Sequence, residues 1–259
     1  MPVFEAMAVL SPSAALLTKT LQPKITTNLQ TPIFINKSTG KLESNKIISI
    51  CSPQLSNTKA SAISGSPGIE AGSGLVSEDT TNILDTVEVF DLNGNAIPFS
   101  DLWKDRKAVV AFARHFGCVL CRRRADYLAA KKDIMDASGV ALVLIGPGSV
   151  DQAKTFSEQT KFKGVYADPS HSSYKALQFV SGVSTTFTPK AGLKIIQSYM
   201  EGYRQDWKLS FEGDTVAKGG WQQGGIIVAG PGKTNISYIH KDKEAGDDPD
   251  IEDIIKACC

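Results

Sequence analysis

Short apolar runs recur along the C-terminal two thirds of the chain, each bounded by glycine, proline or charged residues. Runs of this length, rich in valine, isoleucine and alanine, are typical of buried strands. The pattern predicts strands at residues 87–90, 107–116, 140–145, 165–167, 226–229 and 235–240. Asn93-Gly94, shortly after the first run, is the residue pair expected in the turn between two hairpin arms.

Segments with helical periodicity separate most of these strands, and Ser149 and Asp250 stand where helix caps are expected. The pattern predicts helices near residues 100–103, 122–137, 150–156, 172–179 and 251–257. Strands that alternate with helices are joined as parallel neighbours by crossovers, whereas the last two strands form an antiparallel hairpin. We therefore expect an α/β fold with a central mixed sheet flanked by helices.

Residues 181–220 lie outside a minimal fold of this kind and form a predicted insertion before the last hairpin. Its apolar residues recur close to helical spacing, at Leu193, Ile196, Tyr199, Met200, Tyr203 and Trp207. A stripe of this kind most often faces the core. The alternative is a lid over a functional site, which would form an apolar groove for a lipid peroxide or a partner protein.

The first 64 residues differ in composition from the rest. They contain six lysines, no arginine, two acids (Glu5 and Glu43) and 16 serines and threonines, which gives a net charge of +4. A basic, acid-poor segment rich in hydroxyl side chains is typical of an organelle transit peptide, and the lack of arginine favours the chloroplast, with the stroma as destination. A disordered tail without a targeting role is the alternative. We expect cleavage within residues 51–74 and a domain spanning 82–259.

Length and charge exclude several classes of protein. The 259 residues carry 28 Lys and Arg against 27 Asp and Glu, a net charge of +1, so a broad basic surface for nucleic acid is not expected. No run of 18 apolar residues exists, which excludes a membrane-spanning helix. Five cysteines are too few for a disulfide-stapled scaffold of this length, so each needs its own explanation.

Cys118 and Cys121 form a CxxC motif where a predicted buried strand gives way to a helix. A thiol at a helix N-terminus lies beside unpaired N–H groups and the positive end of the helix dipole, which favours the thiolate. Arg114 and His115 precede the pair, and three arginines follow it. Two intervening residues also let the second sulfur reach the first and close a disulfide. We expect Cys118 to attack and Cys121 to resolve.

Other interpretations of the cysteines compete with the redox one. Half of a zinc site would need a second ligand pair, and Cys258-Cys259 and the isolated histidines lack the spacing. An iron–sulfur cluster would need more cysteines, and two merely buried cysteines would not require this spacing. The turns around Gly146 and Gly232 match nucleotide-binding loops only in part, so we expect no cofactor and no metal.

The roles of the neighbouring residues stay open from the sequence. His115 invites a general-base role toward Cys118, although a locally packed histidine explains it as well. The arginines at 122–124 can be a solvated helix face or can point back at the thiols. Cys258 and Cys259 can act as a mobile resolving pair, but a passive tail is the favoured interpretation.

The segment FARHFGCVLCR at 112–122 resembles the active-site segment of the peroxiredoxin-like 2 proteins, an AhpC/TSA group of the thioredoxin-like superfamily. QQGG at 222–225 and HKDKE at 240–244 are also similar to that group, and the resemblance extends from Thr86 to Cys258. It implies a thioredoxin-like fold and thiol-based redox activity. The N-terminal segment fits a chloroplast-targeted plant member.

Several positions depart from better understood relatives. Typical peroxiredoxins have a threonine three residues and a proline seven residues before the attacking cysteine, where this chain has His115 and Ala111. The cis-proline of thioredoxins is replaced by Gly224-Gly225, which would still allow a close backbone approach to a substrate. Arg114 can supply the positive charge that peroxiredoxins place near their thiolate.

The expected activity is that of a thiol-dependent oxidoreductase. Cys118 and Cys121 would reduce a peroxide, a lipid hydroperoxide or a protein disulfide, with Arg114 and His115 assisting, and a thioredoxin- or glutaredoxin-type dithiol donor would restore the pair. The alternative is a noncatalytic redox sensor, in which the disulfide state of the pair controls partner binding.

Overall fold

The computed structural model of the protein describes residues 78–218 and 220–259. The expected transit segment 1–64 and its cleavage region 51–74 lie outside the described residues. The first described element is helix α2 (Glu78–Asp85), which begins four residues before the domain boundary expected at Asn82.

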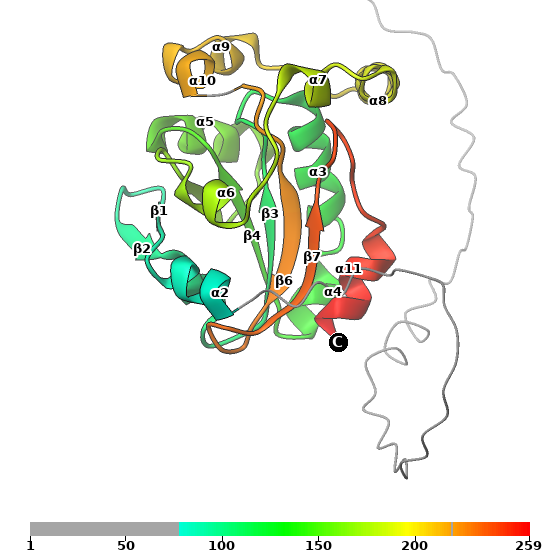
Figure 1. Ribbon diagram of the computed structural model, residues 1–259. Coiled ribbons are helices and arrows are strands. Elements are labelled where there is room, and N and C mark those ends of the chain that lie inside the picture. Colours follow the sequence, from blue (N-terminus) through cyan, green and yellow to red (C-terminus); the bar gives the residue numbers. More distant parts are fainter. Residues whose placement is uncertain (1–77, 219) are drawn as a thin grey trace, which may run out of the picture. The chain divides into compact units, whose positions relative to one another are not determined.

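Within the described residues, seven strands form one mixed sheet in the order β2-β1-β5-β4-β3-β6-β7 (Figure 1). β3, β4 and β5 run parallel to one another, and β6 and β7 form an antiparallel hairpin beside β3. The strands are β1 (Glu88–Phe90), β2 (Ala96–Pro98), β3 (Ala108–Phe112), β4 (Ala141–Gly146), β5 (Val165–Ala167), β6 (Gly225–Ala229) and β7 (Ile236–Lys241). This arrangement confirms the expected thioredoxin-like α/β fold with a mixed sheet.

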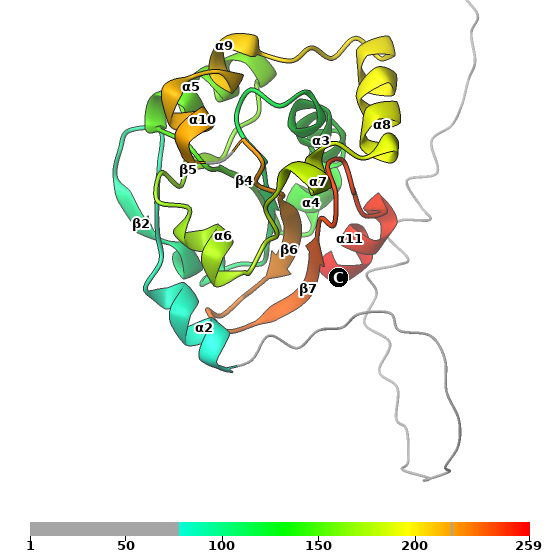
Figure 2. The same cartoon turned by 45° about the horizontal axis from the view of Figure 1, so that its top comes forward.

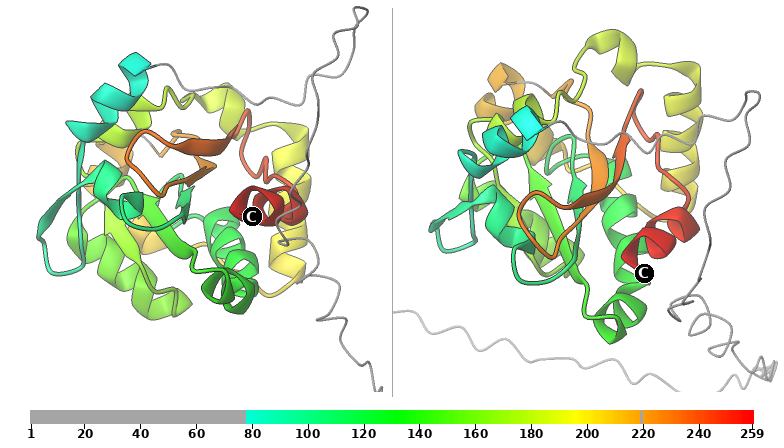
Figure 3. Two further views of the ribbon diagram at one scale, coloured as in Figure 1. Left: turned by 90° about the horizontal axis from the view of Figure 1, so that it is seen from below. Right: turned by 60° about the horizontal axis from the view of Figure 1, so that its bottom comes forward.

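Helices cover both faces of the sheet. The helical elements outside the insertion are α2, the 3-10 helix η1 (Phe99–Trp103), α3 (Val119–Ala129), α4 (Lys132–Ala137), α5 (Val150–Thr160), α6 (Ser172–Ala176) and α11 (Ile251–Cys258). Ser149 caps α5 in a capping box with Gln152, and Asp250 caps α11, as the sequence predicts. Figure 3 shows α11 on the same side of the sheet as α3 and α4.

Strand β3 separates two hydrophobic cores. Val109 and Ala111 point into the core beneath α3, α5 and α11, whereas Val110 and Phe112 point into the core beneath α2, η1 and α6. Every residue of β3 is therefore buried, which explains why its sequence is a continuous apolar run rather than an alternating one. This buried strand fixes the starting point of the segment that carries the cysteines.

Two sequence-based boundaries near the cysteines are wrong. The strand predicted at 107–116 ends at Phe112. The Ala113 N–H still donates to the carbonyl of Ile145 at 2.8 Å, but residues 114–118 leave the sheet and turn where the Cys118 N–H donates to the carbonyl of His115 at 3.2 Å. The helix predicted to continue to residue 137 is interrupted after Ala129 and resumes at Lys132.

The insertion supplies four helices among the described residues: α7 (Val183–Thr186), α8 (Pro189–Met200), α9 (Trp207–Ser210) and α10 (Gly213–Lys218). They lie beyond the end of the sheet at which β3 ends (Figure 1). Figure 2 shows α8 on one side of the N-terminal end of α3, with α9 and α10 on the other.

The expectation that the apolar stripe of the insertion faces the core is wrong for most of its residues. Tyr199 and Tyr203 pack against the core, but the other four side chains are exposed: Leu193, Ile196, Met200 and Trp207. Helix α8 instead buries its small residues, Ala191 and Ser198, because these allow it to approach α3 closely. No helix in the described part of the chain is long and apolar enough to cross a membrane.

Candidate active site

Cys118 and Cys121 lie at the junction between β3 and α3. Cys118 is the N-cap residue of α3, and Cys121 is in its first turn, so both face the same helix end. Their side chains are buried, with 1% of Cys118 and 5% of Cys121 exposed. Both cysteines are free thiols in this structure. The predicted strand–helix setting of the CxxC motif is confirmed.

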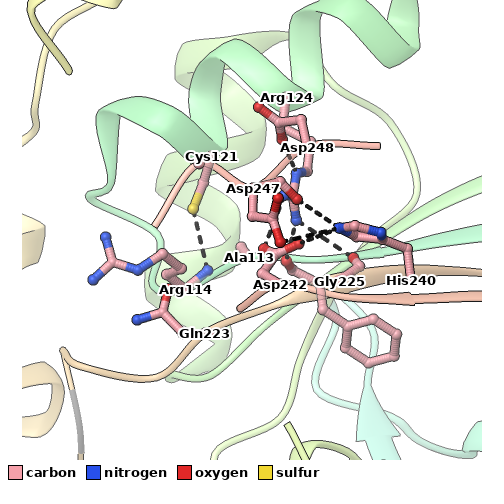
Figure 4. Close-up of polar contacts among 12 residues, drawn as sticks. Ala113, Arg114, Cys121, Arg124, Gln223, Gly225, His240, Asp242, Asp247 and Asp248 are labelled. Carbon is pink, nitrogen blue, oxygen red and sulfur yellow. Dashed lines mark hydrogen bonds and ion pairs between the residues drawn. The ribbon is translucent and has the colours of Figure 1, made fainter. Parts of the chain in front are cut away.

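Arg114 contacts both sulfurs. Its Nη1 lies 3.7 Å from the Sγ of Cys118. Its backbone N–H donates to the Sγ of Cys121 at 3.1 Å, as Figure 4 shows. The other end of the guanidinium, Nη2, donates to the Oγ1 of Thr186 at 3.0 Å and to the carbonyl of Gly220 at 3.2 Å. The insertion therefore holds this buried arginine against the cysteine pair.

The surroundings of the two thiols shift their pKa values in opposite directions. The pKa of Cys118 is held well below its ordinary value by the hydrogen bond from Cys121, with further help from the positive charge of Arg114. Burial raises the pKa of Cys121 well above its ordinary value, and the negative sulfur of Cys118 raises it further. The pair can therefore hold one thiolate and one thiol at neutral pH, with the charge on Cys118.

His115 is buried beside the pair, but its chemistry is that of a neutral ring. Burial lowers its pKa to about 4, and its Nδ1 has no hydrogen-bond partner. A base of such low pKa holds a proton poorly at neutral pH, which weakens the general-base interpretation. The ring can still accept a hydrogen bond.

The three arginines that follow the motif have different roles, and in the described part of the chain none of them donates a hydrogen bond to the sulfur of Cys118 or Cys121. Arg122 donates to Gln159, and Arg123 pairs with Glu201 on an exposed face. Arg124 is buried and pairs with Asp242 at 2.8 Å and with Asp248 at 2.6 Å (Figure 4). The solvated-face interpretation therefore holds for Arg123 and is wrong for Arg124.

A segment of the insertion covers the cysteine pair. The side chain of Gln205 accepts a hydrogen bond from the N–H of Val119 at 2.8 Å, and the N–H of Asp206 donates to the carbonyl of Gly117 at 2.9 Å. A Cβ on Gly117 would overlap the Oγ of Ser210 and lie 2.6 Å from the carbonyl of Asp206. We call residues 203–210 the cover segment.

The sequence suggests that Gly224 and Gly225 let a substrate backbone come close, and the surroundings of the two glycines do not support this expectation. A Cβ on Gly224 would overlap the carbonyl of Phe112, and one on Gly225 would overlap the carbonyl of His240. The two glycines therefore allow β6 to pack closely between β3 and β7. Their neighbours are strands of this chain and leave no place for a substrate backbone.

Cys258 lies far from the CxxC pair. Lys107, which precedes β3, donates to the carbonyls of Ala257 and Cys258, whereas Cys118 follows the other end of that strand. Burial raises the pKa of Cys258 to about 11. In this arrangement Cys258 cannot reach Cys118, which agrees with the favoured interpretation of the tail.

Sequence reasoning missed several residues that complete the site. Thr186 and Gln223 hydrogen-bond to each other at 2.9 Å behind Arg114, and Gln205 and Asp242 also lie near the pair. They come from distant segments, and only two of them lie in stretches that the sequence analysis noted: Gln223 in QQGG and Asp242 in HKDKE. Among the described residues, no group of three or more His, Cys, Asp or Glu side chains is placed to hold a metal ion.

Comparison with known proteins identifies this combination of fold and cysteine pair. The family model described as AhpC/TSA antioxidant enzyme matches residues 127–244. The chain belongs to the peroxiredoxin-like 2 family of AhpC/TSA proteins.

Individual relatives agree with this assignment. A chloroplastic thioredoxin-like protein, AAED1 of Arabidopsis thaliana, is 75% identical over 77% of this chain and 81% of its own length. Peroxiredoxin-like 2C of Homo sapiens is 29% identical over 65% of this chain and 75% of its own. Prostamide/prostaglandin F synthase of Salmo salar is 34% identical over 68% of this chain and 84% of its own length. The first of these confirms the predicted chloroplast localisation.

Proposed function

We propose that this protein is a chloroplast thiol-dependent oxidoreductase that reduces peroxide or disulfide substrates through Cys118 and Cys121. The observation that carries the proposal is the contact of Arg114 with both sulfurs, at 3.7 Å and 3.1 Å. A buried cation at a helix N-terminus stabilises a thiolate on Cys118, and the thiolate is the reactive form of cysteine.

The proposed cycle has three steps. The Cys118 thiolate attacks the terminal oxygen of a hydroperoxide, the O–O bond breaks, and a sulfenic acid and an alcohol form after proton uptake. Cys121 then attacks the Cys118 sulfur, releases water and closes the disulfide. An external dithiol of the thioredoxin or glutaredoxin type reduces that disulfide and is itself oxidised.

His115 has a supporting role in this proposal. With a pKa near 4 the ring is neutral at physiological pH, so it adds no charge near the thiolate. Its unpartnered Nδ1 can accept a hydrogen bond from the distal O–H of the hydroperoxide. We therefore assign orientation of the substrate, rather than proton abstraction, to His115.

Exposed apolar side chains of the insertion, together with the adjoining Trp221, favour a substrate with an apolar portion, such as a lipid hydroperoxide. Phe187 packs against Trp221 with ring centroids 5.4 Å apart, and Trp207 stacks on Phe211 at 5.8 Å. All four of these side chains remain largely exposed. Apolar surface of this kind near a functional site is a common feature of ligand-binding regions.

The test compares Cys118→Ser and Cys121→Ser with the wild-type protein. We expect wild type to turn over hydrogen peroxide or a fatty-acid hydroperoxide with a thioredoxin-type recycling system. Cys118→Ser should lose all activity, and Cys121→Ser should complete the first oxidation without forming the disulfide. Cys258→Ser should behave as wild type. Activity that survives in Cys118→Ser would show that the nucleophile is another group.

The redox sensor is the second candidate function, and the burial of the pair favours it. Cys118 is 1% exposed, and the cover segment bonds to the residues on either side of it. Oxidation of the pair would alter these contacts and the surface above them. Reversible formation of the Cys118–Cys121 disulfide, with altered partner binding and without multiple turnover by any donor, would favour the sensor.

A further inference from the structure

Cys121 shares a small cavity with several charged residues, among them the buried Arg114, Arg124 and Asp242. The cavity is large enough for about one water molecule. Its lining consists of Arg114, Leu120, Cys121, Arg124, Asp242, Gly246 and Asp248. Cys121 and Arg124 both reach it because residues three apart on α3 lie on the same helix face.

Asp242 is the unusual member of this lining. Its side chain is 1% exposed, and its Oδ2 accepts a hydrogen bond from Arg124 at 2.8 Å. Its Oδ1 is buried and has no hydrogen-bond partner. A buried carboxylate oxygen without a partner costs free energy, so its presence beside a thiol needs a reason.

Several charged or titratable groups surround this carboxyl. The positive charge of Arg124 and the ring of His240, whose Nε2 lies 3.6 Å from Oδ1, favour ionisation, whereas Asp248 opposes it. Burial outweighs these effects and raises the pKa of Asp242 to about 6. The facing groups are Arg124, Tyr127 and Cys121 from α3, His240 from β7, Asp247 and Asp248 from the following loop, and Arg114 across the cavity.

We propose that Asp242 is the proton acceptor for Cys121, acting through a water molecule in the shared cavity when Cys121 attacks the oxidised Cys118. The inference rests on the resolving role proposed for Cys121. It explains the unpartnered Oδ1, which is the oxygen left available for a proton once Arg124 has engaged Oδ2.

Every proton is accounted for when Cys121 closes the disulfide. The Cys121 thiol loses its proton to the water, and the water passes a proton to the Asp242 carboxylate. The Cys121 thiolate then forms the S–S bond and expels hydroxide from the Cys118 sulfenic acid. The Asp242 carboxyl returns the proton to the departing hydroxide, so that the products are the disulfide and water.

The test uses a dipyridyl disulfide in place of a peroxide, so it does not depend on peroxidase activity. Attack by Cys118 breaks the reagent's S–S bond and releases one pyridinethiol, and attack by Cys121 on the resulting mixed disulfide releases the second. Acid quenching, tryptic digestion and mass spectrometry of peptide 115–122, which contains both cysteines, separate the two steps.

We expect Asp242→Asn to leave the first step unchanged and to slow the second roughly a hundredfold at pH 7, the effect of losing a general base. The rate of the second step should also lose its dependence on an ionisation near pH 6. The matched control is Asp248→Asn. Asp248 also pairs with Arg124 and also lines the cavity, so this variant removes a comparable negative charge from the same place. An equal effect of the two variants, or an unchanged pH profile in Asp242→Asn, would overturn the proposal.

A measurement on the wild-type protein keeps the inference testable if Asp242→Asn does not fold. The carboxyl carbon of Asp242 can be titrated by NMR in the dithiol and the disulfide forms. We expect a higher pKa in the dithiol form, because the Cys118 thiolate disfavours a second negative charge nearby. An identical pKa of Asp242 in the dithiol and disulfide forms would refute the proposed coupling between Asp242 and the cysteine pair. Failure of peroxide turnover with normal reagent kinetics would count against the proposed function alone.

Discussion

The guanidinium of Arg114 lies 3.7 Å from the sulfur of Cys118, and the same residue's backbone N–H donates to the sulfur of Cys121. One residue thus contacts both thiols, and it contacts them with different groups. The side-chain contact adds a positive charge beside Cys118, whereas the backbone contact fixes the position of Cys121. Thr186 and Gly220 hold the guanidinium in place from the insertion.

Removal of the Arg114 charge should raise the pKa of Cys118. In Arg114→Met we expect an increase of about one to three pKa units, because an opposite charge at this distance favours the ionised form by that amount. The measurement is the pH dependence of alkylation of the Cys118 peptide. Arg123→Met is the control, since Arg123 pairs with Glu201 away from the thiols. Equal shifts in the two variants would contradict the assignment.

Loss of Arg124 should destabilise the protein strongly. Arg124→Met leaves the buried carboxylate of Asp242 without its cation, and breaking a buried pair in this way costs about 3–5 kcal/mol. The neighbouring Arg123→Met breaks an exposed pair and should cost about 0–1 kcal/mol. Denaturant unfolding measures both. Similar losses would mean that burial of the Arg124 pair does not determine its contribution.

Gly117 should tolerate no side chain while the cover segment is closed. In Gly117→Ala we expect the free energy of unfolding to fall by about 1–3 kcal/mol, because the new methyl group overlaps Ser210. Gly192→Ala is the matched control, since its Cβ would meet nothing within 4 Å and alanine favours a helix by about 1 kcal/mol. A loss of stability in Gly192→Ala equal to that in Gly117→Ala would argue against the overlap.

Opening of the cover segment should expose Cys118. Gln205→Ala removes the acceptor for the Val119 N–H and the contact with Ser210, so a bulky thiol reagent should label Cys118 faster. Lys208→Ala changes an exposed side chain of the same segment and should leave the labelling rate unchanged. Unchanged labelling in Gln205→Ala would mean that this contact does not control access.

The buried His115 should make stability depend on pH. Its folded pKa is about 4, and the ordinary value is 6.5, so between these values the unfolded state binds more protons than the folded state. The stabilisation is present above pH 6.5 and is lost as pH falls toward 4. Relative to His115→Gln, wild type should lose about 3 kcal/mol over this range in chemical denaturation. A constant difference would show that the ring is solvated.

Much of the fold could be predicted because its strands are short apolar runs with distinct boundaries. β3 is buried on both faces, so its five residues are all apolar and were easily recognised. The exact ends were harder to predict. Hydrophobicity alone does not mark the end of the strand at Phe112, because Ala113 and Phe116 are as apolar as the strand itself and both are buried.

The amino-acid sequence by itself determined the chemistry available to this protein: two thiols two residues apart, at a strand–helix junction rich in arginine. Those features depend on local spacing and on the helix end. Only the tertiary structure decided which arginine contacts the sulfurs, which one is buried with Asp242, and what covers Cys118. These contacts join segments far apart in the chain, and they depend on how the insertion and β7 pack against α3, which local pattern does not encode.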